Sequence, residues 1–365
     1  MILLYYYVIE KGSGMNKPKA SPRRAVGLRR IAEDLGISVS LASKVLSGKL
    51  GTTGAQESTI RAIHEKAREL NYRKNQLAAA FRTGRQHVIA VCVHRHGAEG
   101  SEIVEEMVAG IAAEAAEFHQ RLMILYYQTP EEFHAFVPEV HCNAVDGVIM
   151  GGLPHTELLG DLTEMRERGL PVVTIHDRQI DPDFPNMGMN QIDVGRLATR
   201  HLFDRGCRRI VHLRMPRGMP GSAPVLRFEG YCQALREVGL PYEPTLVADL
   251  RHLNYDEGRK GIQALLDSGV AFDGIVGLSD QHAAAALNLL MENGRKVPQE
   301  VKLIGIDNAP FCRYTIIPLS SVSQEFVLRG HQAMRMLMSG LQGEPTASIN
   351  VEPVIHARKS SAGIP

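Results

Sequence analysis

Apolar residues recur at helical spacing in three short stretches near the start of the chain. The first stretch runs from Leu28 to Leu35 and stops at Gly36, where a helix C-cap is expected. Ser38 can cap a second helix that stops at Gly48, and a third stretch covers about 58–70. Three short helices within fifty residues predict a compact all-α bundle.

After Val88 the pattern changes to apolar, β-rich runs that alternate with helical segments of about 10–18 residues. Continuous apolar strands separated by helices are typical of doubly wound parallel sheets. The runs lie at 88–93, 121–127, 145–150, 171–176, 209–213, 244–249, 273–278 and 301–306. About eight strands in this length favour two such sheets over one.

Between these two regions, residues 71–87 are polar and basic. They include one Ala-rich, helix-capable stretch, Gln76–Arg82, which is shorter than the ~12–15 residues that an isolated helix needs. A partner surface would have to order it.

Charge is spread unevenly over a chain whose formal net charge is only +1. Residues 1–87 carry 16 Lys and Arg against 6 Asp and Glu, so the remainder is acidic. A basic segment ahead of an acidic body indicates a polyanionic partner for the first part. The alternative is a solvated basic tail.

The segment from Leu28 to Gly48 reads as a helix, a Gly-containing turn and a second helix, the pattern of a helix-turn-helix. The second helix would present Val39 to a thymine methyl and Lys44 to a guanine, with Ser40 able to pair with either kind of base edge. Serines nearby suit phosphate contacts. The candidate DNA contacts here are Leu28, Arg29, Ser38, Val39, Ser40, Ser43, Lys44 and Ser47. A generic pair of packed helices is the alternative.

Four runs in order along the chain carry a specific resemblance: GISVSLASKVLSG, ELNYRKNQLAAAFRTGR, LRFEGYCQAL and GLSDQHAAAALNLLMENGRKVPQEVKLIGIDN. Together they resemble the lactose-repressor (LacI/GalR) family of bacterial transcription regulators, and the resemblance extends over residues 27–360. It implies a homodimer on a pseudo-palindromic operator in double-stranded DNA, with binding controlled by a small-molecule effector.

In that family the linker forms a hinge helix on operator DNA, and a hydrophobic residue opens a base step from the minor groove. Phe81 stands at that position, and an aromatic wedge suits unstacking. Asn75 and Ala78 match the hinge pattern, whereas Lys74 stands where the family often has Pro. The alternative for Phe81 is packing against its dimer mate.

The resemblance further implies a two-lobed, periplasmic-binding-protein-like body, so the fold class is α/β with a small all-α head. We expect an N-terminal extension at 1–26, the helix-turn-helix domain at 27–73, the hinge at 74–87 and the sensing domain at 88–365. Within the last, the N-lobe would take about 88–188 and 322–342, and the C-lobe about 189–320 and 343–360.

Effector contacts are expected in the cleft between the lobes, where Arg and Asp suit a polyhydroxy or anionic ligand. The candidates are Arg227, Asp307, Asp280, Asp177, Leu253, Gln324 and His94. An Asp that follows a parallel strand often caps the next helix, which is the alternative for each of them. Leu253 stands where the family usually has an aromatic, so a sugar ligand is less secure than the resemblance suggests.

Several function classes lack their usual signals. The sequence has no nucleophile elbow, no P-loop, no strand-associated GxGxxG and no HExxH, so we expect no enzyme. Five scattered cysteines and the His94–His96 pair predict no metal, and we expect no cofactor. The apolar run Met1–Ile9 is too short to span a membrane, and residues 1–14 are expected to be an upstream extension. We therefore expect a cytoplasmic regulator, with a periplasmic-type solute-binding protein as the remote alternative.

Overall fold

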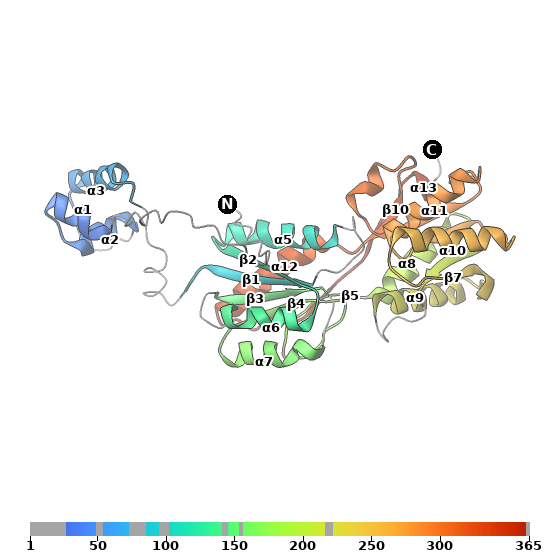
Figure 1. The fold of residues 1–365 in the computed structure, drawn as a ribbon, viewed down its shortest axis with the longest axis horizontal. Helices are drawn as coiled ribbons and strands as arrows, with labels where there is room; N and C mark the ends of the chain where they lie inside the picture. The colour runs from blue at the N-terminus through green and yellow to red at the C-terminus, as the bar shows by residue number, and fades with distance from the viewer. Residues whose placement is uncertain are drawn as a thin grey trace, which may run out of the picture. The chain divides into compact units, whose positions relative to one another are not determined.

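A computed structural model describes residues 27–48, 54–72, 85–94, 102–140, 145–152, 156–215 and 222–362. The chain divides into two compact units, Leu3–Gln86 and His87–Pro365. We call the described part of the first unit the head and that of the second the body (Figure 1).

The head contains three helices, α1 (Leu28–Leu35), α2 (Val39–Leu46) and α3 (Glu57–Glu69), where the apolar spacing predicted them. Gly36 takes a left-handed conformation with φ 62°, which ends α1. The hydroxyl of Ser38 then accepts a hydrogen bond from the Leu41 amide and caps α2. One fully buried side chain from each helix, Ile31, Ala42 and Ile63, holds the three together.

The first half of the body is a parallel sheet of four strands in the order β2-β1-β3-β4, which we call the N-lobe sheet. Its strands are β1 (Val88–His94), β2 (Arg121–Tyr127), β3 (Gly147–Gly151) and β4 (Val172–Ile175). Its helices are α5 (Ile103–Glu117), α6 (Pro130–Glu139), α7 (Leu159–Glu167) and α12 (Phe326–Leu341), with a short 3₁₀ turn η2 (Thr156–Leu158). Helices α5 and α12 cover one face, and α6 and α7 cover the other (Figure 1).

The second half is a sheet of six strands in the order β12-β10-β9-β8-β6-β7, the C-lobe sheet, parallel except for β12. Its strands are β6 (Ile210–Arg214), β7 (Val247–Asp249), β8 (Gly274–Val276), β9 (Lys302–Asp307), β10 (Ser320–Ser323) and β12 (Val354–His356). Its helices are α8 (Gln191–Asp204), α9 (Ala223–Glu237), α10 (Tyr255–Asp267), α11 (Asp280–Glu292) and α13 (Lys359–Ala362), with 3₁₀ turns η3 (Pro244–Leu246) and η4 (Pro310–Arg313). One apolar cluster forms under α8 and α9 and another under α10 and α11.

Two chain segments connect the sheets in ways the sequence did not predict. The strands β5 (Met187–Met189) and β11 (Ile349–Val351) pair with each other in a sheet of their own. Both are three residues long, as is β12, and such short runs give no clear period. The strand predicted at 244–249 was wrong over its first half, where Pro244 begins the 3₁₀ turn η3. Proline lacks the N–H that a strand ladder needs.

Each sheet carries one pair of helices that approach each other through glycines. In the N-lobe, a Cβ on Gly110 of α5 would overlap the carbonyl oxygen of Val327 in α12. In the C-lobe, a Cβ on Gly195 of α8 would overlap the carbonyl oxygen of Arg227 in α9, and Gly230 packs in the same way on Ile192. The close contact between α8 and α9 therefore fixes the position of the Arg227 backbone relative to α8.

Candidate functional site

The helix-turn-helix presents the predicted base-reading residues to solvent. Val39 is 42% exposed, and Ser40 and Lys44 are also exposed on α2. Arg29 is exposed on α1, whereas Leu28 is half-buried against the head core. The first turn of α2 and its Lys44 are thus accessible to a partner.

The three serines of the motif have structural roles as well. The Ser38 hydroxyl caps α2, and the Ser47 hydroxyl donates to the carbonyl oxygen of Ser43 at 2.5 Å. Ser38 keeps its O–H donor for a phosphate, whereas Ser47 would have to release the Ser43 carbonyl before it could donate to one. The predicted hinge contacts Asn75, Ala78 and Phe81 lie outside the described residues, so they stay predictions.

In the body, polar side chains from both sheets converge around Gln191, the first residue of α8. Arg227 donates through Nε to Gln191 Oε1 at 2.8 Å and through Nη1 to the carbonyl oxygen of Leu278 at 2.7 Å. Its Nη2 lies 3.9 Å from Asp307 Oδ1. Gln324 donates to that same oxygen at 2.5 Å. Three predicted effector residues, Arg227, Asp307 and Gln324, are therefore brought together.

Asp177 joins this cluster from the N-lobe, two residues after β4. Its Oδ1 accepts a hydrogen bond from Gln191 Nε2 at 2.9 Å. Gln191 Nε2 also donates to Gln324 Oε1 at 2.5 Å. We call Arg227, Gln191, Asp177, Gln324 and Asp307 the cleft ring, after the cleft that the family resemblance implies between the lobes. It joins strand ends of one sheet to strand ends of the other, which is where ligands bind in doubly wound folds.

The N-lobe side contributes two histidines, at the ends of β1 and β4, which lie on either side of β3 in the sheet. His94, at the end of β1, is 7% exposed, and its Nε2 lies 2.9 Å from the carbonyl oxygen of Gln128. His176, just after β4, is 2% exposed, and its Nδ1 lies 2.7 Å from the carbonyl oxygen of Gly152. Gly152 backs directly onto His94. His176 was absent from the sequence prediction, although its place just before Asp177 could have suggested it.

Burial shifts the pKa values of titratable groups in and around the ring. Burial raises the pKa of Asp307 above its ordinary range, and the neighbouring Arg227 guanidinium opposes that shift. Glu106, on α5, is half-buried, and its burial together with the charge of Asp307 raises its pKa to about 7. Burial also lowers the pKa of His282, on α11, to about 4, so this imidazole is neutral at physiological pH. The ring therefore combines one buried carboxyl group, that of Asp307, and one partly exposed carboxyl group, that of Asp177, with one engaged arginine.

Two predicted effector residues lie elsewhere. The Asp280 carboxylate is buried against Gly305, and its Oδ2 accepts from the Ala309 amide at 2.7 Å. Leu253 is partly buried against the C-lobe core. In these positions Asp280 holds the turn after β9 and Leu253 packs in the interior.

The turn after β9 is itself unusual, because Asp307 and Asn308 both have positive φ, 109° and 59°. Side chains hold it from several sides. Ser321 Oγ accepts from the Asn308 amide at 2.9 Å, and Arg358 Nη2 donates to Asn308 Oδ1 at 2.5 Å. These bonds aim the Asp307 carboxylate at the ring at some cost in backbone strain.

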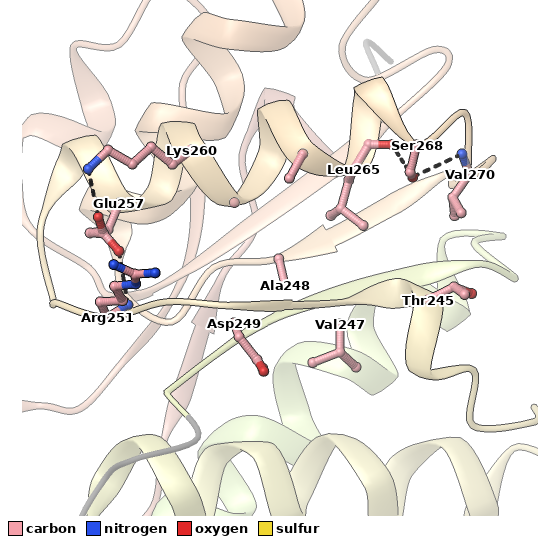
Figure 2. Close-up of a pocket in the computed structure, with 12 residues that line it drawn as sticks. Thr245, Val247, Ala248, Asp249, Arg251, Glu257, Lys260, Leu265, Ser268 and Val270 are labelled. Atoms are coloured by element: carbon pink, nitrogen blue, oxygen red, sulfur yellow. Dashed lines mark hydrogen bonds and ion pairs between the residues drawn. The ribbon is translucent and has the colours of Figure 1, made fainter.

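A separate groove of about 610 Å³ lies between β7 and α10, on the outer edge of the C-lobe sheet. Figure 2 shows Glu257 on its rim, bonded to Lys260 and to the Arg251 amide. None of the predicted effector residues lines this groove. The cleft ring is therefore the stronger candidate site.

Other kinds of site lack support in the part of the chain that the structure describes. Its His, Cys, Asp and Glu side chains form no cluster of three or more that could hold a metal ion. None of its helices is both long and apolar enough to cross a membrane.

Comparisons with known proteins show which domain and which proteins this chain is similar to. A periplasmic binding protein-like domain matches residues 199–361. The HTH-type transcriptional regulator CelR of Thermobifida fusca is 27% identical over 350 residues, which cover 93% of this chain and 99% of that protein. The ribose operon repressor of Halalkalibacterium halodurans is 24% identical over 329 residues, covering 89% and 93%.

Solved structures agree. A CelR–cellobiose complex is 25% identical with a TM-score of 0.65, covering 92% of this chain and 99% of that one. The lac repressor dimer bound to operator and the anti-inducer ONPF has a TM-score of 0.77 at 19% identity, covering 93% and 99%. At that identity the second likeness speaks for the fold.

A periplasmic binding protein-like domain matches residues 199–361 of the body, and the relatives that align with nearly the whole chain are transcription regulators. The chain is similar along nearly its whole length to DNA-binding transcription regulators of the lactose-repressor (LacI/GalR) family.

Proposed function

We propose that this protein represses transcription by binding a pseudo-palindromic operator as a homodimer, with its operator affinity set by a small molecule in the cleft between the lobes. Two observations together carry the proposal. The α2 residues Val39, Ser40 and Lys44 are exposed, and the two sheets of the body are joined by a ring of hydrogen-bonded polar side chains.

The roles in the head follow from chemistry. Lys44 would donate to guanine O6 or N7, Val39 would contact a thymine methyl, and Ser40 would pair with either kind of base edge. Arg29 and the Ser38, Ser43 and Ser47 hydroxyls would position the head on phosphates. Asn75, Ala78 and Phe81 would add minor-groove contacts from the hinge.

The effector that the ring suits best is a carbohydrate. Hydroxyl groups both donate and accept, which matches the carboxylates of Asp177 and Asp307 beside the Arg227 guanidinium. One similar structure is a CelR–cellobiose complex and one relative is a ribose operon repressor, and both support a carbohydrate effector. A non-carbohydrate effector, or none, is the alternative.

An exposed apolar loop supports self-association. Tyr314 and Ile316, which follow η4, are 82% and 74% exposed. Large apolar side chains at such exposure mark interaction surfaces, and a second copy of the chain would cover them.

An enzymatic role and a pure solute-binding role compete with this proposal. The relatives are regulators rather than enzymes, and the head has no purpose in a solute-binding protein. We therefore propose a protein that is no enzyme and that works in the cytoplasm, where the operator is.

The proposal is tested by selecting duplexes from a random DNA library with the full chain and measuring affinity against salt. We expect log affinity to fall steeply with log salt, and Lys44→Ala to relax base preference at one position of each half-site by ~1–3 kcal/mol. Lys66→Ala, on α3, removes the same charge from the head and should leave base preference unchanged. A protein that selects no duplex would contradict the proposal.

A further inference from the structure

The amide of Gln191, on the C-lobe helix α8, makes three hydrogen bonds, and the one to Asp177 reaches the N-lobe. Its Nε2 donates to Asp177 Oδ1 in the N-lobe and to Gln324 Oε1 where the chain passes from β10 to α12, at 2.9 and 2.5 Å. Its Oε1 accepts from Arg227 Nε at 2.8 Å. The side chain is 1% exposed, so these partners account for the donors and one acceptor site of a buried amide.

The orientation of this amide follows from its partners. Arg227 only donates, so it must face the oxygen of Gln191, and the nitrogen must then face the Asp177 carboxylate. Gln324 is oriented in the same way, because its own nitrogen faces the Asp307 carboxylate. A ligand that enters the ring has to replace bonds that already exist.

Arg329, on α12, stands behind Asp177 and is far less well satisfied. Its side chain is 1% exposed, and its Nη2 donates to the carbonyl oxygen of Met187 at 3.1 Å. Among the described residues, no acceptor lies within hydrogen-bonding reach of its Nε or Nη1. Its guanidinium carbon lies 5.2 Å from the centre of the Phe326 ring. Burial lowers the pKa of this arginine, and the charge of Asp177 opposes that shift.

A buried arginine with unpaired N–H groups is costly, because water has been removed and no protein acceptor replaces it. The nearest carboxylate oxygen is Asp177 Oδ1, 3.9 Å from Nη2. That is beyond a hydrogen bond, and the same oxygen is held by Gln191 from the other lobe. A shift of Asp177 toward Arg329 would form the charge-assisted bond that the arginine lacks.

We propose that Gln191 is a clasp between the lobes, and that Asp177 moves from Gln191 to Arg329 when an effector takes the place of the amide. The inference rests on the proposed effector-controlled function and deepens it, since it names the residues that couple the cleft to α12.

In energetic terms, Asp177 exchanges its hydrogen bond with Gln191 for one with Arg329. In the clasped form Asp177 is bound across the lobes and Arg329 is left with unpaired donors. In the released form Asp177 pairs within its own lobe, so the N-lobe gains a bond and the interlobe contact loses one. Arg329 is carried on α12, which packs against α5 through Gly110 and Gly330, so the exchange acts on that helix pair.

A double-mutant cycle in the effector-free full chain tests this. Gln191→Glu keeps an acceptor for Arg227 but removes both donated bonds, so Asp177 is released. Arg329→Met removes the receiving guanidinium and fills a similar volume, which buried apolar groups tolerate well. We expect Arg329→Met alone to raise the Tm, and the double variant to lose more stability than the two single changes predict together.

Arg335→Met is the matched control. Arg335 lies on the same helix with 68% of its side chain exposed and binds Glu114 instead. Its effect should add to that of Gln191→Glu without coupling. Additive behaviour of the Gln191–Arg329 pair would overturn the exchange of partners.

Hydrogen exchange of the same variants gives a second readout. Gln191→Glu should speed exchange several-fold in the peptides around 187–194 and 324–330, and unchanged exchange there would overturn the clasp. On the duplex selected by the wild type, Gln191→Glu should change affinity about tenfold without any effector. If the wild type selects no duplex, the proposed function fails, while the stability cycle and the exchange data still decide the clasp.

Discussion

Each lobe of the body contains a buried arginine near an aspartate, but the two arginines differ in how many hydrogen bonds they make. Each lobe places its arginine 3.9 Å from an aspartate at a strand end, Arg227 with Asp307 in the C-lobe and Arg329 with Asp177 in the N-lobe. Each arginine sits on a helix that approaches its neighbour through a glycine. The equal distances would suggest two equivalent ion pairs.

The remaining donors separate the two arginines. Arg227 also gives Nε to Gln191 and Nη1 to the carbonyl oxygen of Leu278, so its guanidinium is largely satisfied. Arg329 has a single hydrogen bond, to Met187, among the residues that the structure describes. The distance between the charges therefore says little about what a buried arginine contributes to stability. The number of its donors that are hydrogen-bonded distinguishes Arg227, which holds the structure, from Arg329, which can still take a partner.

Among the variants that test this comparison, we expect the largest loss of stability for a substitution of Arg227. Arg227→Met leaves Asp307 buried without its counter-charge, so we expect the free energy of unfolding to fall by about 3–5 kcal/mol. Arg214→Met, which breaks a largely exposed pair with Asp249, should change it by only ~1 kcal/mol or less. Urea denaturation of both variants checks the difference, and equal losses would mean that the C-lobe pair is no better satisfied than a surface pair.

A smaller effect is expected where the helices meet. Gly195→Ala forces a methyl group against the carbonyl oxygen of Arg227, and Gly110→Ala does the same at Val327, so each should lose about 1–3 kcal/mol. Gly160→Ala, on α7 with open space around it, should gain ~0.5–1 kcal/mol from helix propensity. Thermal unfolding of the three variants gives the order, and a neutral Gly195→Ala would show that α8 and α9 can separate freely.

The smallest effect concerns pH. Burial and the nearby Asp307 raise the pKa of Asp280 above its ordinary range. Above pH ~4 the unfolded chain then loses a proton that the folded chain keeps, so stability falls as pH rises. We expect wild type to lose about 1 kcal/mol or more between pH 5 and 8, and Asp280→Asn to lose less because an amide does not ionise. Parallel pH slopes in denaturant titrations of the two proteins would count against this assignment.

How far sequence reasoning reached differs between head and body. The helices of the head were predictable because their signals are local, with apolar residues three and four apart, Gly36 at a C-cap and Ser38 at an N-cap. The alternation of strands and helices in the body was predictable for the same reason. The roles of Asn75, Ala78 and Phe81 stay predictions on the family resemblance.

The site was less accessible to sequence reasoning. Arg227, Asp307, Gln324 and Asp177 were named, but His176, Gln191 and Arg329 were missed. Gln191 follows β5, a three-residue strand without a readable period, so nothing local marked it as a strand-end residue. Asp280 stays a prediction as an effector contact, because an Asp after a strand looks the same in sequence whether it faces a ligand or accepts a hydrogen bond from a backbone turn, as Asp280 does.

By itself the sequence determined the periodic elements and the basic head, because each rests on residues close together in the chain. Four runs spread along the chain carried the family resemblance. The cleft ring joins Asp177, Gln191, Arg227, Asp307 and Gln324, which lie up to 147 positions apart. Only the tertiary structure decided which of their donors are satisfied, since hydrogen bonds are set by distance and angle to within a fraction of an ångström. For the same reason only the folded chain showed that Arg227 donates hydrogen bonds through both Nε and Nη1, whereas Arg329 makes a single hydrogen bond to the described residues.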